Sequence, residues 1–328
     1  MKKIRAWLIR GLVVLLFTSL LGWALRNAPL PQIWLALIRL QGWQIGVILV
    51  LNCMLYLLVT LRWWIIVHAQ TPEIPFWPLV AVRVAVFGIS YFTLGPQVGG
   101  EPLQVLALQR KYGLTYSRAT ASVLMDKLLE FLVNFLLLVI GLAAIFRAGL
   151  LAENGPRLIA ILVLLGGLLA WPLIHILLMY NHIHPLTFLM RALPAVTRKS
   201  KPARFLRVSE WLAGTFCRRH PQALIKSVGV SMLAAAGMLL DYALMLAFLG
   251  IDLPFWRVVA GWTAGWLSFL APLPGGLGAL EASQVFALGF FGIPAAAAIS
   301  VTLLMRARDL IIGGLGLALT GNVISRVK

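Results

Sequence analysis

Long apolar runs separated by short polar segments set the pattern of this chain. A run of about 20 apolar residues lets an α-helix cross the hydrocarbon core of a bilayer. Six runs come near or above this length, at about 7–25, 43–67, 116–146, 157–179, 222–250 and 294–320. They predict six membrane-spanning helices.

Two further apolar stretches, 77–95 and 254–272, each end in a cluster of proline and glycine. Only about 13–15 residues then follow before the next break, near 112 and 291. Broken helices at membrane depth are tolerated where protein or a cavity surrounds them. The pattern predicts two helix hairpins that enter the membrane and turn back, although two complete crossings would give the same parity.

The two hairpin regions also repeat each other. The first contains Gly95-Pro-Gln-Val-Gly-Gly-Glu101 and the second contains Pro272-Leu-Pro-Gly-Gly-Leu-Gly278, and a long helix with buried charges follows each. A shift of 179 residues superimposes Gly113 on Gly292, Lys127 on Arg306 and Glu130 on Asp309.

Composition supports the membrane interpretation. The 328 residues are 61% hydrophobic and 12% charged, with a mean hydropathy of +0.94, which excludes an ordinary soluble domain. The net charge of +18 sits mostly in short segments between apolar runs, as in loops beside anionic lipid, so nucleic acid is not the expected partner. Cys53 and Cys217 form neither a disulfide framework nor a metal cluster, and no cofactor or metal is expected.

The distribution of Lys and Arg predicts the orientation. With the N-terminus inside, eighteen of these residues lie on the cytoplasmic side and five on the other. The two hairpins then enter from opposite sides, so the repeats are inverted, an architecture of alternating-access transporters. We expect an all-α polytopic protein of the cytoplasmic (inner) membrane with both termini cytoplasmic. Its parts are one transmembrane domain (1–328), a first repeat (43–150), a cytoplasmic basic linker (181–221) and a second repeat (222–320).

The basic linker contains an amphipathic helix from about Ala203 to Arg219. Apolar residues recur there at helical spacing while basic residues face elsewhere, which favours a helix lying on the inner leaflet. Gathering lipid or docking a partner is the alternative role.

Two charge pairs lie deep in long apolar runs. Lys127 and Glu130 are roughly 16–21 Å from the start of their helix, and Arg306 and Asp309 roughly 18–22 Å, close to the centre of a ~30 Å core. A charge there costs at least ~2.5–3.5 kcal/mol, so it needs partners or water. A spacing of three lets each cation bind the acid in its own pair, and two structural ion pairs are therefore one interpretation.

Further charges favour the other interpretation, a hydrated polar cavity. They are Glu101, Asp126, Glu281 and Arg308, with Arg83 as a second cationic lining residue. Arg62 is expected to snorkel to the cytoplasmic surface. Asp241 fits either a cavity wall or a hydrogen bond between helices.

The glycine clusters suggest an anion site. Gly99, Gly100, Gly275 and Gly276 permit tight turns, and the helices after them point their positive ends into the membrane interior. Because several cations lie nearby, the ligand that such a site favours is a phosphate. Tight turns and close helix contacts alone are the simpler explanation.

The motifs resemble a known family. They are Gly99-Gly-Glu-Pro-Leu-Gln-Val-Leu-Ala-Leu, Ser117-Arg-Ala-Thr-Ala-Ser-Val-Leu-Met-Asp-Lys-Leu-Leu-Glu130, Pro272-Leu-Pro-Gly-Gly-Leu-Gly-Ala-Leu-Glu281 and Leu303-Leu-Met-Arg-Ala-Arg-Asp309. In order and spacing they are similar to the flippase-like transmembrane domain of lysylphosphatidylglycerol synthases. The resemblance implies a lipid-translocating domain whose glycine-rich elements and buried charges form the headgroup path. Relatives commonly carry Arg where Lys127 stands, which leaves the headgroup preference open. No aminoacyl-transfer domain follows before Lys328, so a stand-alone member without synthase activity is expected.

These observations predict a flippase, not an enzyme, that moves a polar, phosphate-bearing lipid or lipid-linked headgroup between leaflets. A membrane-embedded lipid or glycosyl transferase and an accessory subunit that recruits a lipid-modifying enzyme are the alternatives. The expected partners are the membrane and an anionic phospholipid or lipid-linked substrate, with a homodimer or a lipid-modifying enzyme as protein partners. The expected substrate-binding residues are Arg83, Gly99, Gly100, Glu101, Lys127, Glu130, Gly275, Gly276, Glu281, Arg306, Arg308 and Asp309.

Overall fold

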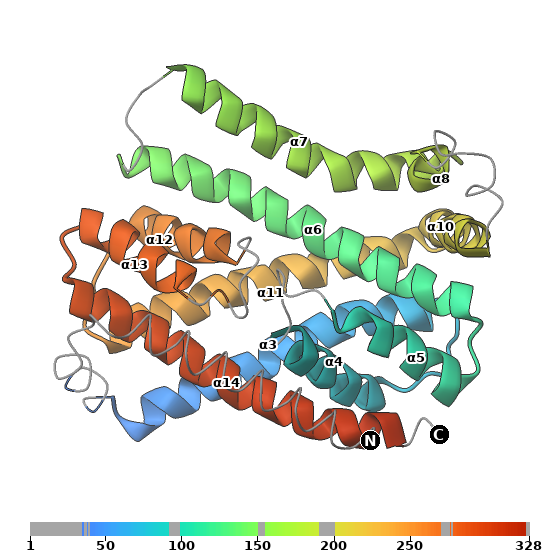
Figure 1. Ribbon diagram of the computed structural model, residues 1–328, viewed down its shortest axis with the longest axis horizontal. Helices are drawn as coiled ribbons and strands as arrows, with labels where there is room; N and C mark the ends of the chain where they lie inside the picture. Colours follow the sequence, from blue (N-terminus) through green and yellow to red (C-terminus); the bar gives the residue numbers. More distant parts are fainter. Residues whose placement is uncertain are drawn as a thin grey trace, which may run out of the picture.

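The part of the chain that the computed structural model describes is helical throughout (Figure 1). It comprises residues 40–91, 99–149, 155–189, 201–269 and 276–325 without 277, together with positions 35 and 38. The helices are α3 (Gly42–His68), α4 (Phe76–Tyr91), α5 (Glu101–Tyr112), α6 (Tyr116–Arg147), α7 (Gly155–Tyr180), α8 (Pro185–Leu189), α10 (Lys201–Arg219), α11 (Pro221–Phe248), α12 (Phe255–Ser268), α13 (Ala279–Phe290) and α14 (Ala295–Ser325).

Five of the six long apolar runs form helices with nearly the expected bounds, namely α3, α6, α7, α11 and α14. The sixth run, 7–25, lies outside the described residues. Among those described, α3, α6 and α11 are long and apolar enough to cross a membrane. Large apolar side chains such as Met54 on α3, Leu233 on α11 and Leu315 on α14 are exposed, as expected for helix faces that contact lipid. The chain is therefore a multi-pass membrane protein.

Each predicted hairpin region holds two short helices. The first contains α4 and α5, with 16 and 12 residues, and the second contains α12 and α13, with 14 and 12. At 1.5 Å per residue these helices are roughly 18–24 Å long, less than the ~30 Å core. The α12–α13 pair lies at one end of the long helices, and α5 lies toward the other end, where α10 is found (Figure 1).

The closest helix packing joins the N-terminal and C-terminal parts of the chain. α3 packs along α11, and α4 packs along α14. A Cβ added to Gly88 would lie 2.6 Å from the backbone nitrogen of Leu317, and one added to Gly316 would lie 2.2 Å from the carbonyl oxygen of Val84. Small residues allow such close approach of helix backbones in membranes. The regions 43–150 and 222–320 therefore pack closely against each other along these two helix pairs.

The amphipathic helix predicted in the linker is α10, which appears end-on in Figure 1 and so crosses the direction of the long helices. Its buried residues include Ala213 and Phe216, which pack in a cluster with residues of α6 and α7. Val208 and Trp211 are exposed. α10 therefore has one face on the protein and leaves part of its apolar surface available to the membrane.

A buried carboxylate attaches α10 to the short helix α8. Glu210 accepts hydrogen bonds of 2.8 Å from the backbone amides of Leu186 and Thr187 and from the Thr187 hydroxyl. Burial alone would raise the pKa of Glu210, but these bonds and the nearby His175 outweigh it and hold that pKa below its usual value. The attachment is therefore favoured when Glu210 is ionised, and it weakens as the pH falls through the lowered pKa.

Candidate functional site: two buried charge networks

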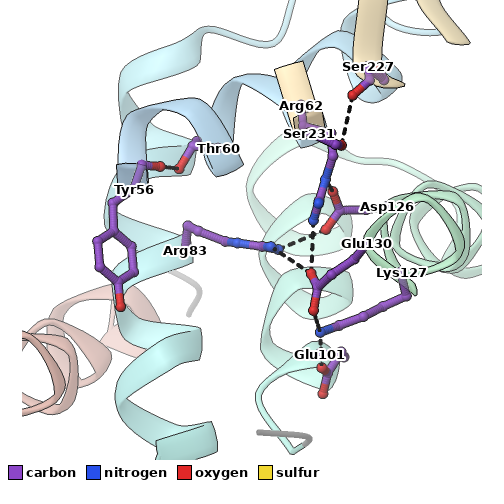
Figure 2. A network of polar contacts seen from close by, with 10 residues as sticks. All are labelled: Tyr56, Thr60, Arg62, Arg83, Glu101, Asp126, Lys127, Glu130, Ser227 and Ser231. Atoms are coloured by element: carbon purple, nitrogen blue, oxygen red, sulfur yellow. Dashed lines mark hydrogen bonds and ion pairs between the residues drawn. The ribbon is translucent and has the colours of Figure 1, made fainter. Parts of the chain in front are cut away.

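Six charged side chains from four helices meet beside the middle of α6 (Figure 2). We call this group the first charge network. It consists of Arg62 from α3, Arg83 from α4, Glu101 from α5, and Asp126, Lys127 and Glu130 from α6.

The inner part of the first charge network is centred on Asp126. Its two carboxylate oxygens bind Arg62 Nε at 2.6 Å and Arg83 Nη1 at 2.8 Å. Glu130, one helical turn further along α6, binds the same two guanidinium groups at 2.9 and 3.3 Å. Asp126 is fully buried and Arg62 is 4% exposed. Each charge here is compensated by hydrogen-bonded partners, as burial in a low-dielectric interior requires.

The other part of the network is centred on Lys127. Its ammonium lies 2.9 Å from Glu130 Oε1 and 3.1 Å from Glu101 Oε1. The side chains of Lys127, Glu130 and Glu101 are 19, 25 and 16% exposed. The network is therefore fully buried at Asp126 and partly exposed at Lys127.

Glu101 also caps the glycine turn that precedes α5. Its carboxylate accepts a 2.8 Å hydrogen bond from the Gly99 amide, and the Gly100 amide donates to Ser90 Oγ at 3.0 Å. A Cβ on Gly100 would lie 2.4 Å from the carbonyl oxygen of Val86. Gly100 thus allows a close contact between α4 and the start of α5. The amides of Gly99 and Gly100 bind the protein's own oxygens, and the place expected for an external anion holds the carboxylate of Glu101.

The C-terminal half of the chain repeats this arrangement. Glu281, in the first turn of α13, accepts a 2.9 Å hydrogen bond from the Gly278 amide. Arg306 on α14 donates from Nε and Nη2 to the two oxygens of Glu281, with an Nη2–Oε2 distance of 2.8 Å, and from Nη2 to the Gly276 carbonyl at 3.3 Å. Each half therefore holds a glutamate between a glycine amide at a helix N-terminus and a cation from the following long helix.

A separate ionic group lies around Arg308, two residues further along α14. We call it, together with the Arg306–Glu281 pair, the second charge network, which consists of Asp241, Glu281, Arg306, Arg308 and Asp309. Arg308 binds Asp309 at 2.8 Å through Nη2 and also binds Asp241 of α11. Asn52 of α3 donates to Asp241 at 2.8 Å. The group thus connects α3, α11 and α14.

The structure brings the predicted charged residues into these two networks and corrects several details. Lys127 pairs with Glu130 as expected. Arg306 binds Glu281, however, and it is Arg308 that binds Asp309, because the guanidinium of Arg306 reaches across to α13. Gly275 lies outside the described residues.

The further charges that favoured a hydrated cavity all have partners of opposite sign. The first charge network has three cations and three carboxylates, and the second has two cations and three carboxylates. Ion pairs that hold helices together therefore account for the described contacts.

Sequence reasoning placed Arg62 wrongly and left Asn52 out. Arg62 is buried and bonded to Asp126, so it does not snorkel. The signal available in the sequence was the presence of Asp126 and Glu130 on one helix face, where Lys127 alone cannot neutralise both. Asn52 carries no such signal, because its partner Asp241 is 189 residues away.

Comparison with known proteins agrees with the motifs in these networks. The family described as "Lysylphosphatidylglycerol synthase TM region" matches residues 7–316. Searches of curated proteins and of solved structures gave no significant match. The matched range spans nearly the whole chain and contains both charge networks, and the chain therefore belongs to the lysylphosphatidylglycerol synthase transmembrane family.

Proposed function

We propose that this protein moves a phosphate-bearing lipid between the leaflets of the cytoplasmic membrane, without covalent chemistry, and that the headgroup contacts the two charge networks on its way. The family supports a membrane function related to lipids. The observation that carries the proposal is the partly exposed part of the first charge network, where Lys127 is held by Glu101 and Glu130 and all three side chains retain some exposure.

The bonding of Glu101 suggests how a headgroup would be accepted. A carboxylate that binds both a helix N-terminal amide and a cation occupies a site with the chemistry of a phosphate site. A headgroup phosphate that enters there would displace Glu101 from Lys127, and in the second charge network it would displace Glu281 from Arg306. The protein's own acids thus keep the cations neutralised while no lipid is bound, which lowers the cost of their burial.

The arrangement of the short helices supports access from both sides. The α12–α13 pair and α5 lie toward opposite ends of the long helices, and the sequence repeat relates the regions that contain them. We therefore interpret the two halves as inverted repeats, each offering one amide–glutamate–cation site to one leaflet.

A test uses two variants of one ion pair in proteoliposomes containing fluorescent phosphatidylglycerol. Lys127→Ala removes the cation, so we expect lipid transfer to slow about tenfold, the effect of losing ~1.4 kcal/mol of charge-assisted bonding. Glu101→Gln removes the competing charge but keeps an oxygen for the Gly99 amide, so we expect half-maximal transfer at a lower mole fraction of the lipid. Lys111→Ala, at an exposed position in the last turn of α5, is the control and should transfer lipid like the unmodified protein.

Opposite effects of the two variants would support a headgroup site. A purely structural ion pair predicts that both variants lose activity together with thermal stability, and that result would count against the proposal. Formation of a new lipid product from a labelled donor would instead indicate the transferase alternative.

A further inference from the structure

A cavity of about 700 Å³ lies between the C-terminal end of α3 and the junction of α10 and α11. We call it the basic cavity. None of its lining residues belongs to either charge network. Its polar lining residues are His68, Arg219, His220, Gln222 and Lys226, beside Trp64.

The lining of the basic cavity favours an anion. Among the described residues no carboxylate lines it, whereas Arg219, Lys226 and two histidines do. Arg219 and Lys226 are exposed, and neither takes part in an ion pair with another described residue. Their charges are thus available to a ligand.

The backbone adds donors to the same cavity. α11 begins at Pro221 without a side-chain cap, and the first amides of a helix that lacks a cap are open to an external acceptor. The two amides concerned belong to Gln222 and Ala223, and both residues line the cavity. The helix macrodipole also makes this end positive.

Two of the lining residues, Trp64 and His68, stack on each other. Nδ1 of His68 is buried and makes no hydrogen bond with any described residue. The imidazole stacks on Trp64 with ring centroids 4.3 Å apart, which fixes its orientation. The stacked pair therefore forms a fixed wall of the cavity.

We propose that the basic cavity binds the phosphate group of an anionic phospholipid from the leaflet beside α10. A lipid fits better than a free ion for two reasons. Leu61, Ile65 and Trp64 add an apolar wall to the cavity, and its volume exceeds what a phosphate alone would fill. The exposed Val208 and Trp211 on α10 place the neighbouring helix at a membrane surface, where such lipids are found.

The proposal can be tested by hydrogen–deuterium exchange of the purified protein in detergent with dihexanoyl phosphatidylglycerol. A phosphate bound at the start of α11 should slow exchange in a peptide covering residues 220–226. We expect Arg219→Glu/Lys226→Glu to abolish this protection. Arg118→Glu/Arg204→Glu, which changes the net charge equally at two exposed positions outside the cavity, should keep it. Arg219→Gln/Lys226→Gln replaces the reversed variant if that variant does not fold, and it should also lose the protection.

Two comparison ligands test whether the bound phosphate must belong to an anionic lipid. Dihexanoyl phosphatidylcholine and inorganic phosphate should each give little protection at the same concentration. Equal protection by phosphatidylcholine would overturn the requirement for an anionic lipid, and equal protection by inorganic phosphate would overturn the assignment to a lipid. Protection that survives the Arg219 and Lys226 substitutions would overturn the site itself.

Discussion

At the residue scale, the charge networks show how a membrane protein buries so many ionised groups. Asp126 is fully buried, yet each of its oxygens binds a guanidinium group. Removing one partner of such a group leaves an uncompensated charge, which costs far more than the intact pair contributes. A single substitution in either network should therefore lower the stability of the folded protein markedly.

Arg62→Ala is expected to destabilise the protein by about 3–5 kcal/mol, the usual cost of breaking a buried ion pair. The measurement is thermal unfolding in detergent, with Arg118→Ala at an exposed position as the control that should change little. Arg62→Ala combined with Asp126→Asn should recover part of the loss, because the second change removes the unpaired charge. A single variant as stable as the unmodified protein would contradict the buried ion pair.

Local sequence spacing predicted some of these contacts and missed others. The pair Lys127–Glu130 follows from a helical spacing of three. The bonds from Arg62 and Arg83 to Asp126 join residues 64 and 43 positions apart, so they depend on how α3 and α4 pack against α6. Helical spacing also favoured Arg306 with Asp309, but α13 offers Arg306 a nearer carboxylate in Glu281.

At the element scale, hydropathy predicted the described long helices well because lipid imposes a minimum apolar length. The proline and glycine clusters likewise predicted the division of each hairpin region into two short helices, since such residues interrupt helices. The sequence did not indicate that α4 would pack along α14 or α3 along α11. Helix partners in a membrane depend on surface shape, which hydropathy does not report.

Gly88→Leu and Gly316→Leu are expected to destabilise the protein by several kcal/mol, because a side chain at either position meets the backbone of the other helix. Gly314→Leu is the matched control on α14, since a Cβ there meets nothing within 4 Å. Thermal unfolding of the three variants in one detergent compares them directly. Equal stability of all three would show that α4 and α14 do not pack as closely as described.

At the scale of the whole molecule, the balance of Lys and Arg predicts an orientation for the two ends at which the short helices lie. α5 lies toward the end where α10 is found, and the α12–α13 pair lies at the opposite end. The basic linker that contains α10 is expected on the cytoplasmic side. We therefore expect the turn after α5 to face the cytoplasm and the turn before α12 to face outward.

Cysteine labelling tests this orientation after Cys53 and Cys217 are replaced by alanine. Lys111→Cys and Asp252→Cys place single thiols at exposed positions in these two regions. A membrane-impermeant maleimide should label Asp252→Cys in intact cells, and it should label Lys111→Cys only after the membrane is permeabilised. Labelling of both thiols from the same side would contradict the proposed topology.

The main-chain contact between Gly88 and Gly316 has a mechanical consequence. With no side chain between them, α4 and α14 cannot slide or turn against each other without a clash, so they should travel as a single rigid unit. That unit holds Arg83 of one network and Arg306 of the other, whereas their carboxylate partners Asp126 and Glu281 lie on α6 and α13. A displacement of the unit relative to α6 and α13 would strain ionic bonds in both networks at the same moment, which offers a direct way to synchronise them.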